Sequence, residues 1–404
     1  MTATLDDDDP KTRPAAFLLP GRHRRAEAGS PWIYSNEIRM DAAAKALAAG
    51  ALVTLKRADE SPLGVAFFNP HTLIAARLLD RDAERPIGAR FFARRLERAL
   101  RLRERLCEEP YYRLVHAEAD GLPGLVVDRF GEVLVVEENT AGMDRLEPHL
   151  LDALEALLRP KAIVLKNDSP ARSLEGLPLE GKVARGAIEE RVLVREGGAS
   201  FPIDPLAGQK TGWFFDQREN RAFLARLAKG ARVLDLYCGV GGFAVLAGRA
   251  GAREIVAIDR SEPALDLARE AARLNGVEEH SEFRRGEAFA EAARLGEAGG
   301  RFDLVIADPP AFAKSKKDVG AALRGYRKLA RLCARLVARS GILFVASCSY
   351  HTSGEEFAEA VRRGLQDAGR SSRILRQAGA GPDHPIHPAL PETQYLKTLT
   401  LALD

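Results

Sequence analysis

The chain has 404 residues and a net charge of +3 at pH 7, from 60 lysines and arginines against 57 acidic residues. This length exceeds one ordinary domain, so we expect two or three, and the near balance of charge neither requires nor excludes nucleic acid as a partner. The four cysteines form no C-x-x-C pair, which argues against a zinc site or a disulfide framework and favours a reducing, cytoplasmic location.

The first residues, MTATLDDDDPKTRP, are acidic and lack the apolar run of a signal peptide. We therefore expect residues 1–14 to form a disordered tail. No stretch of the sequence approaches the length of a membrane span, so we expect no association with a membrane.

Residues 15–88 carry short apolar runs separated by glycine, proline, asparagine and charged turns, which predicts a small β-rich domain. Within it, the run Gly21–Arg25 is densely basic and is followed by Trp32 and Tyr34. Basic and aromatic side chains together suit phosphate contacts and base stacking. A solvated loop beside a core tryptophan explains the same residues, and the sequence leaves both interpretations open.

Residues 89–110 predict a linker helix. From Arg90 to Cys107 the apolar residues recur at helical spacing on or near one side, with seven arginines elsewhere. Those apolar residues are Phe91, Leu96, Leu100, Leu102 and Leu106. The arginines could follow an RNA backbone, or they could pair with Glu97 and Glu104 on an ordinary solvent-exposed face.

Residues 111–205 predict a second small domain, of α+β type. We expect a hairpin over 125–136, a helix over 146–158, a strand over 162–166 and a second hairpin over 191–203. No recognisable chemistry lies in these residues, so we interpret the domain as a platform.

Residues 206–404 predict a doubly wound α/β domain. The segment Gly208–Arg221 concentrates hydrogen-bonding and aromatic groups, which suggests a ligand lid. Strands are then expected over 231–237, 254–259, 282–285, 302–308 and 342–347, with a helix after each. Two more strands, over 372–377 and 394–403, complete a seven-stranded sheet with a final antiparallel hairpin.

The stretch Ala231–Phe243, ARVLDLYCGVGGF, predicts a buried strand that enters a glycine-rich turn and then a helix. In an open α/β sheet, such a turn lies where nucleotide-like ligands bind. The glycines from Gly239 onward also fit a dinucleotide-binding pattern, with Asp259 at the place of a ribose-binding acid. A nicotinamide-dependent dehydrogenase is therefore one alternative.

Acidic residues follow successive strands, at the edge where a doubly wound sheet binds its ligand. Asp259 can accept two ribose hydroxyls and Glu287 an adenine amino group, although either acid could instead cap a helix. Asp308 is followed by Pro309 and Pro310, which fix the backbone. This predicts a rigid, acceptor-rich rim suited to the Watson–Crick edge of a flipped base.

Cys348 follows the strand expected over 342–347 and would reach the same edge of the sheet. As a thiolate it could add to C6 of a pyrimidine and make C5 nucleophilic. Burial as a small apolar side chain is the usual alternative for a free cysteine. Lys210 or Lys314 could lower the pKa of the Cys348 thiol or contact phosphate, and each could equally be an ordinary solvent-exposed lysine.

Six segments together resemble the bacterial 23S ribosomal RNA cytosine-C5 methyltransferases of the large-subunit methyltransferase I family. They are HAEADGLPGLVVDRFG, GQKTGWFFDQRENR, VLDLYCGVGGF, AIDRS, DPPAFAKSKK and SCSYH. The similarity covers nearly the whole chain beyond the acidic tail. It implies an RNA-binding PUA β-barrel over 15–88, the central α+β domain over 111–205, and a Rossmann-like class I S-adenosylmethionine (SAM) methyltransferase domain over 206–404.

The resemblance also implies roles for individual residues. Asp235 and Gly239 would hold the methionine moiety of SAM, Asp259 the ribose and Glu287 the adenine end. Further cofactor contacts are implied for Thr211, Gly212, Phe214, Asp216, Gln217, Arg218, Tyr237, Gly241, Arg260, Ala288 and Asp308.

The catalytic residues implied are Cys348 as the nucleophile and Asp308 at the target cytosine. Many RNA cytosine-C5 methyltransferases carry a second cysteine after the fourth-strand proline, where this chain has Pro310 and Ala311. The base that removes the C5 proton is therefore unassigned. Glu287 also stands where aspartate is more usual.

These implications predict an enzyme that forms 5-methylcytosine in 23S rRNA through a covalent cysteine adduct at C6, with SAM and without a metal. The partner would be the rRNA, and an exposed sheet edge in either small domain could make a homodimer. Two alternatives stay open. One is an rRNA methyltransferase of the same architecture that acts at another position, such as guanine N7, and the other is a non-catalytic RNA-binding assembly factor.

Overall fold

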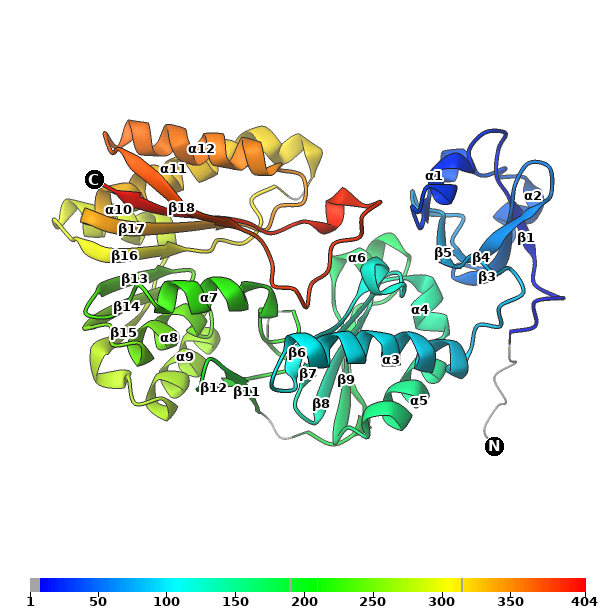
Figure 1. Cartoon of the computed structure of the whole chain (residues 1–404), viewed down its shortest axis with the longest axis horizontal. Coiled ribbons are helices and arrows are strands. Elements are labelled where there is room, and N and C mark those ends of the chain that lie inside the picture. The colour runs from blue at the N-terminus through cyan, green and yellow to red at the C-terminus, as the bar shows by residue number, and fades with distance from the viewer. Residues whose placement is uncertain (1–7, 189–190, 209, 314) are drawn as a thin grey trace. The chain divides into compact units, whose positions relative to one another are not determined.

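The computed structural model describes residues 8–188, 191–208, 210–313 and 315–404. The contacts divide the chain into two units (Figure 1). Unit 1 comprises Met1–Val192, Asp204–Trp213 and Pro382–Pro391, and unit 2 comprises Leu193–Ile203, Phe214–Gly381 and Glu392–Asp404. None of the helices in the described ranges combines the length and apolar character needed to span a membrane.

Unit 1 begins with the β-rich domain that the sequence predicts. Its strands are β1 (Ala15–Phe17), β2 (Trp32–Ile33), β3 (Ala51–Lys56), β4 (Pro62–Phe68) and β5 (Ala76–Asp80), in the order β1-β3-β4-β5-β2. All of β4 after Pro62 is buried. Alternate side chains explain this, because Val65 and Phe67 pack in one hydrophobic cluster while Ala66 and Phe68 pack in another.

The segment before β1 differs from the expected disordered tail. Residues 1–7 lie outside the described residues, but Arg13 is 9% exposed and its Nη1 donates to the carbonyl oxygen of Ala83 at 2.7 Å. Asp8 accepts from the backbone N–H of Ile87 at 2.9 Å. Residues 8–14 are therefore docked by polar contacts to distant residues, which an acidic composition does not reveal.

The second part of unit 1 is a sheet covered by helices. The strands are β6 (Tyr111–His116), β7 (Leu125–Phe130), β8 (Val133–Glu138), β9 (Ala162–Asn167) and β10 (Glu180–Gly186), in the order β10-β9-β8-β7-β6. The helices are α3 (Ala89–Leu106), α4 (Ala141–Arg145), α5 (Glu147–Leu158) and α6 (Pro170–Leu174). The predicted β7–β8 hairpin, helix α5 and strand β9 are confirmed.

Helix α3 follows a different apolar stripe from the expected one. Leu102 and Leu106 are each 41% exposed, whereas Arg103 is fully buried and makes two hydrogen bonds to Asp120, at 2.6 and 2.8 Å. The buried positions Leu96, Ala99, Leu100 and Arg103 keep the i, i+3, i+4, i+7 spacing of one helix face. The face is therefore completed by an ion-paired arginine in place of leucine.

Unit 2 is the predicted doubly wound sheet, with seven strands among the described residues. They are β13 (Arg232–Leu236), β14 (Glu254–Asp259), β15 (Ser281–Arg285), β16 (Phe302–Ala307), β17 (Val337–Ser347), β18 (Ser372–Ala378) and β19 (Lys397–Leu403). Their order is β15-β14-β13-β16-β17-β19-β18. The strands β13 to β17 are parallel, and β19 pairs antiparallel with β17 and with β18.

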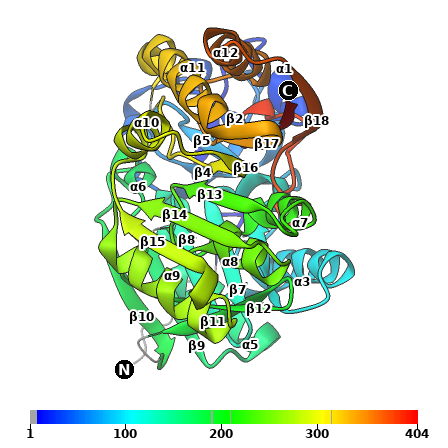
Figure 2. The same cartoon turned by 90° about the vertical axis from the view of Figure 1, so that its left-hand side faces the viewer.

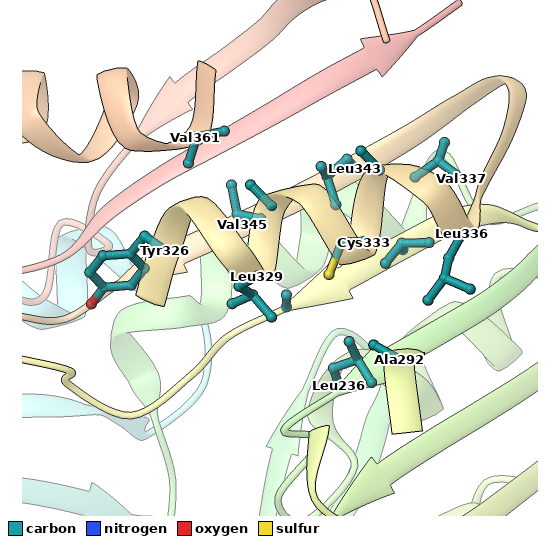
Figure 3. Packing of buried hydrophobic residues seen from close by; sticks show 14 of the residues in the cluster. Leu236, Ala292, Tyr326, Leu329, Cys333, Leu336, Val337, Leu343, Val345 and Val361 are labelled. Atoms are coloured by element: carbon teal, nitrogen blue, oxygen red, sulfur yellow. The ribbon is translucent and has the colours of Figure 1, made fainter. Parts of the chain in front are cut away.

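Helices cover both faces of this sheet (Figures 1 and 2). On one face lie α7 (Arg218–Ala225), α8 (Gly242–Arg249) and α9 (Glu262–Leu274), and on the other lie α10 (Ala288–Glu297), α11 (Val319–Leu336) and α12 (Gly354–Asp367). Figure 3 shows how Leu329 and Cys333 of α11 pack against Leu343 and Val345 of β17. This apolar layer joins α11 to the sheet.

Strand β17 begins at Val337, earlier than the expected residue 342. Its pairing with β16 shifts between Phe302 and Leu304, and Ser340 has a left-handed φ of 59°. A β-bulge at these positions extends the strand backwards, and alternation of apolar residues does not signal it.

The hairpin formed by β11 (Val192–Glu196) and β12 (Ala199–Ile203) packs on α9 in unit 2. The side chain of Asn275 accepts from the Ser200 N–H at 3.0 Å and donates to the Ser200 carbonyl at 2.7 Å. By contacts, most of this hairpin therefore groups with the α/β sheet. The sequence places it in the domain 111–205, and the domain boundaries stay a prediction.

Candidate functional site

The candidate site in unit 2 lies at the carboxyl edge of the parallel strands. Asp235 lies near the end of β13, Asp259 ends β14, and Glu287 follows β15. Asp308 directly follows β16, and its N–H donates to the Leu236 carbonyl at 3.4 Å. Since parallel strands end at the same edge, the topology collects these acids as the sequence predicts.

The glycine-rich turn after β13 brings two of these ends together. The N–H of Gly239 donates to Asp259 Oδ2 at 2.9 Å, and the N–H of Cys238 donates to the Ile258 carbonyl at 3.1 Å. Gly239 has a φ of 53°, and a Cβ there would meet no other atom within 4 Å. The turn thus leaves open space beside Gly239, where a ligand can approach the backbone.

Gly241 serves a different purpose. Its φ is 83°, and a Cβ there would lie 3.1 Å from the Cβ of Ala268 on α9. The side chain is absent because the start of α8 packs closely against α9. Gly241 is therefore explained by helix packing, and a contact with the cofactor stays a prediction.

Asp235 is a fully buried carboxylic acid at this edge. Its Oδ2 accepts from the N–H of Ala244, in the first turn of α8, at 3.1 Å. Within the described part of the chain, Oδ1 has no hydrogen-bond partner. Burial, and then the nearby Asp308 carboxylate, raise the pKa of Asp235 well above its usual value.

The next two acids hold the ends of helices. Asp259 Oδ1 accepts from the Ser261 N–H at 2.9 Å, just before α9, and Glu287 Oε2 caps α10 by accepting from the Phe289 N–H at 3.2 Å. The helix-capping alternative therefore holds for Glu287. A carboxylate oxygen has more than one lone pair, so both acids can still accept from ligand hydroxyl or amino groups.

Three predicted cofactor residues flank these acids. Tyr237 has a left-handed φ of 64°, which is uncommon for a residue with a side chain. Burial, followed by the Glu287 carboxylate, raises the pKa of its phenol. Arg260 is exposed, and Ala288 is buried at the start of α10.

The segment predicted as a lid is pinned by its own polar groups. The hydroxyl of Tyr395 donates to Asp216 Oδ2 at 2.6 Å, and Asn220 donates to Gln217 Oε1 at 2.7 Å. Arg221 makes two hydrogen bonds to Glu196, at 2.6 and 2.8 Å, and a third to the Phe214 carbonyl at 2.9 Å. These contacts fix residues 214–221, the second half of the segment, in unit 2.

The remaining polar residues before α7 divide between the units. The guanidinium of Arg218 lies over the Phe215 ring, 5.1 Å from its centroid. Thr211 and Gly212 belong to unit 1, where the Thr211 hydroxyl donates to Asp128 Oδ2 at 2.5 Å. Lys210 also groups with unit 1, and Lys314 lies outside the described residues. A place for Thr211 and Gly212 in the cofactor site stays a prediction.

Cys348 lies in the loop after β17, beside the loop that carries Asp308. It is half-buried, and its Sγ lies 3.9 Å from the carbonyl oxygen of Pro309. The strands β16 and β17 that end in these loops are direct neighbours. The structure therefore brings the two predicted catalytic positions to adjacent strand ends.

A hydroxyl network joins these two loops, and no sequence motif predicts it. Ser349 Oγ accepts from the Ala313 N–H at 3.3 Å and lies 2.9 Å from the hydroxyl of Tyr326. That hydroxyl also accepts from Ser347 Oγ at 2.8 Å, and the ring of Phe312 stacks on Tyr326. In Figure 3, the Tyr326 oxygen points away from the apolar cluster. Tyr326 lies on α11, far from any motif, so sequence spacing could not place it here.

The basic patch of the β-rich domain is partly engaged within the protein. Arg25 donates to Glu37 Oε2 at 2.7 Å and lies over the ring of Tyr34, 4.3 Å from its centroid. The indole N–H of Trp32 donates to Glu118 Oε1 at 2.8 Å. Arg22 and Arg24 are exposed. Exposed Arg22 and Arg24 fit the interpretation of a phosphate-binding patch. Arg25 and Trp32 instead have partners within the protein, which fits the structural interpretation.

Comparison with known proteins finds two matching families, each over a different part of the chain, and relatives that match most of it. Residues 167–367 match the family described as S-adenosylmethionine-dependent methyltransferase, and residues 17–81 match the PUA-like domain. The chain is 39% identical over 293 residues to ribosomal RNA large subunit methyltransferase I of Aeromonas hydrophila, covering 72% of this chain and 74% of that protein. It is 35% identical over 387 residues to the protein of the same name from Shewanella denitrificans, covering 95% and 97%.

Solved structures share the fold over most of the chain. A crystal structure described as a methyltransferase complexed with SAH covers 96% of this chain and 100% of that one, with a TM-score of 0.83 and 18% identity. A second, described as a SAM-dependent methyltransferase from Streptococcus mutans, has the same coverage and identity and a TM-score of 0.81. The predicted fold class is confirmed, and the cofactor is SAM in place of a nicotinamide dinucleotide.

Proposed function

The chain belongs to the ribosomal RNA large subunit methyltransferase I family, and on this basis we propose that it methylates C5 of a cytosine in 23S rRNA. The observation that carries the choice of base is the position of Cys348. Its thiol lies against the Pro309 carbonyl, next to Asp308, so a nucleophile and an acceptor stand side by side at the sheet edge. Methylation of guanine N7 needs no thiol.

The residues at the carboxyl edge suit SAM. The unpartnered Oδ1 of Asp235 offers an acceptor to the ammonium of the methionine moiety, and the open space at Gly239 admits a ligand against the backbone. The half-buried carboxylate of Asp259 suits the ribose hydroxyls. Asp235, Gly239 and Asp259 would thus hold SAM, which supplies an electrophilic methyl group when bound.

The catalytic work of the chain falls on two residues. The thiolate of Cys348 adds to C6 of the flipped cytosine, so that electron density moves to C5 and toward N3. The carboxylate of Asp308 accepts from the N4 amino group and holds the ring against the rim. After C5 has been methylated, loss of the C5 proton and release of the Cys348 sulfur restore the aromatic ring.

RNA binding would involve the PUA-like domain. Arg22 and Arg24 are exposed basic residues of its patch, where they can contact phosphates. The buried edge of Trp32 and the pairing of Arg25 instead hold the loop that presents them.

The most direct test of the substrate is a comparison of 23S rRNA from cells with and without this protein. We expect loss of one methyl group at a single cytosine, and the purified protein with labelled SAM should restore it. A methyl group lost from a guanine, or no methyl group lost at all, would instead support the guanine-modifying or the non-catalytic alternative.

The role of Cys348 can be tested by replacing it. Cys348→Ala should abolish methyl transfer while leaving SAM binding, measured by calorimetry, unchanged. Cys107→Ala is a matched control, because Cys107 is also half-buried but lies at the end of α3 in unit 1, and it should retain activity. Methylation of cytosine by the Cys348→Ala protein would rule out the covalent mechanism.

A further inference from the structure

Lys397 approaches the Cys348 loop from the neighbouring strand. It is the first residue of β19, and in the antiparallel pairing of β17 with β19 it stands opposite Ser347. Cys348 is therefore one residue beyond the position that faces Lys397. Lys397 lies outside every motif that the sequence analysis used. Helix α12 and strand β18 separate it in the chain from Cys348.

The side chain of Lys397 contacts the same loop. Its Nζ donates to the carbonyl oxygen of Ser349 at 2.6 Å, which fixes the peptide group between Ser349 and Tyr350. The hydroxyl of Ser349 is already held by Ala313 and Tyr326. The residue after Cys348 is thus held at its side chain by one set of groups and at its carbonyl by Lys397.

The ammonium of Lys397 donates to a carbonyl oxygen and not, within the described part of the chain, to a carboxylate. Among the described residues, no carboxylate forms a salt bridge with it. Glu356 on α12 lies near enough to act on it electrostatically, but its Oε2 accepts from the Ser353 N–H at 2.9 Å in the cap of that helix. Burial lowers the pKa of Lys397, and Cys348 is the first of the groups that oppose this effect.

We propose that Lys397 is a positioning residue for the methyl transfer, whose ammonium holds the Ser349 carbonyl and stabilises the thiolate of Cys348. This inference rests on the proposed function of Cys348 as the nucleophile. A cation that is partly withdrawn from water and lacks a carboxylate partner favours the ionised form of a nearby thiol. The protonated lysine would thereby keep more of Cys348 in its nucleophilic form at neutral pH.

Two other titratable groups lie near the same loop. Asp308 carries a charge that opposes ionisation of the Cys348 thiol, whereas Tyr326 is neutral. Asp308 precedes Pro309, whose carbonyl meets the thiol, and its carboxylate disfavours a thiolate. Tyr326 on α11 carries a phenol whose pKa is raised by burial, so it is neutral near pH 7. Among the residues that the structure describes, Lys397 is a cation that can offset Asp308.

The test measures the ionisation of Cys348 without relying on methyl transfer. The rate of alkylation by iodoacetamide is followed for each cysteine by mass spectrometry between pH 6 and pH 10 in the full-length protein, because only the thiolate reacts. In Lys397→Gln and in Lys397→Met, which keeps the apolar stem, we expect the midpoint for Cys348 to rise by about one pH unit or more. Lys397→Arg should keep the midpoint of the wild type.

Controls separate this effect from general disturbance. The midpoint for Cys107 in the same samples should not move. Lys229→Gln should not move the midpoint for Cys348, because Lys229 is exposed and precedes β13, at the opposite edge of the sheet. An unchanged Cys348 midpoint in a folded Lys397→Gln or Lys397→Met protein would overturn the proposal, even if both variants are slow methyltransferases.

The pH dependence of activity gives a second, independent readout. In Lys397→Gln the acid limb of kcat/KM should move to higher pH, with activity recovering above pH 9, whereas a purely structural defect would persist at every pH. A persistent loss at every pH would overturn the inference. If Cys348→Ala remains active, the proposed function fails, and the alkylation experiment still reports separately whether Lys397 acts on the thiol.

Discussion

Asp120 and Asp128 in unit 1 and Asp235 in unit 2 are all buried acids, but they differ in how fully they are hydrogen-bonded. In unit 1, Arg103 makes two hydrogen bonds to Asp120 and Arg113 makes two to Asp128, and each acid receives a further donor, from the His116 N–H or the Thr211 hydroxyl. In unit 2, the equally buried Asp235 has one donor, and its second oxygen has none among the described residues. The saturated acids are structural, whereas the unsaturated one lies where the cofactor is expected.

The difference follows from the cost of burying a charge. An ionised carboxylate withdrawn from water is destabilising unless hydrogen bonds and an opposite charge replace the lost hydration. Asp120 and Asp128 have such partners within the fold. Asp235 would gain a charged partner when a cationic ligand binds. The unfavourable free energy of its burial would then be relieved, and this relief would add to the free energy of ligand binding.

The largest expected effect comes from breaking a saturated pair. Arg103→Ala leaves Asp120 buried without its cation, and we expect a loss of about 3–5 kcal/mol in the free energy of unfolding. Arg101→Ala, on the exposed face of the same helix and paired there with Glu97, should change stability little. Chemical denaturation of both variants measures the difference, and equal stabilities would contradict the structural role of the buried pair.

Removing the charge from Asp235 should not lower the free energy of unfolding, in contrast to removing the charge of Arg103. Because its folded pKa is raised, the protonated form is favoured in the folded protein, and stability falls as pH rises from the unfolded pKa toward the folded one. Asp235→Asn is neutral at every pH and can still accept from Ala244. It should therefore be at least as stable as the wild type at pH 7, with this advantage lost near pH 4.

The same substitution should weaken SAM binding. Loss of one charge-assisted hydrogen bond corresponds to about 1.5–3 kcal/mol, or roughly 10- to 100-fold in affinity. Calorimetric titration with SAM, together with thermal melts, measures both effects. Wild-type affinity combined with reduced stability would show that Asp235 is structural, like the acids of unit 1.

Glu138 in unit 1 resembles Asp235, because it is buried and not fully hydrogen-bonded. Its Oε2 accepts from Asn167 at 3.0 Å, its Oε1 has no partner among the described residues, and burial raises its pKa to about 8. Its folded pKa exceeds the unfolded one, so it lowers stability as pH rises through about 8. Glu138→Gln should stabilise the protein by about 1–2 kcal/mol at pH 9 and have no such effect near pH 4, as denaturation at both values would measure.

Most of the α/β fold could be predicted from the sequence because each of its signals is local. The glycine-rich turn after β13, the acids at Asp259 and Asp308, and the alternation of strands with helices all depend on neighbouring residues. The β7–β8 hairpin and α5 were predictable for the same reason. The bulge in β17 was not, because it depends on pairing with β16.

The groups around Cys348 show where sequence reasoning ends. Tyr326 and Lys397 reach the Cys348 loop from α11 and β19, and their roles depend on contacts between segments far apart in the chain. Arg103 was assigned to a solvent-exposed face because arginine is usually exposed, and its partner Asp120 lies on another element. Long-range polar pairing is the feature that composition and periodicity do not encode.

We expect Cys348 to form a covalent bond to the target cytosine during the reaction. RNA carrying 5-fluorocytosine at the methylated position tests it directly, because fluorine in place of the C5 proton blocks the final elimination. With SAM present, the wild-type protein should give an adduct that survives denaturation and maps to Cys348, and Cys348→Ala should give none. Methylation of the normal RNA without any trapped adduct would show that the reaction does not pass through a covalent bond to Cys348.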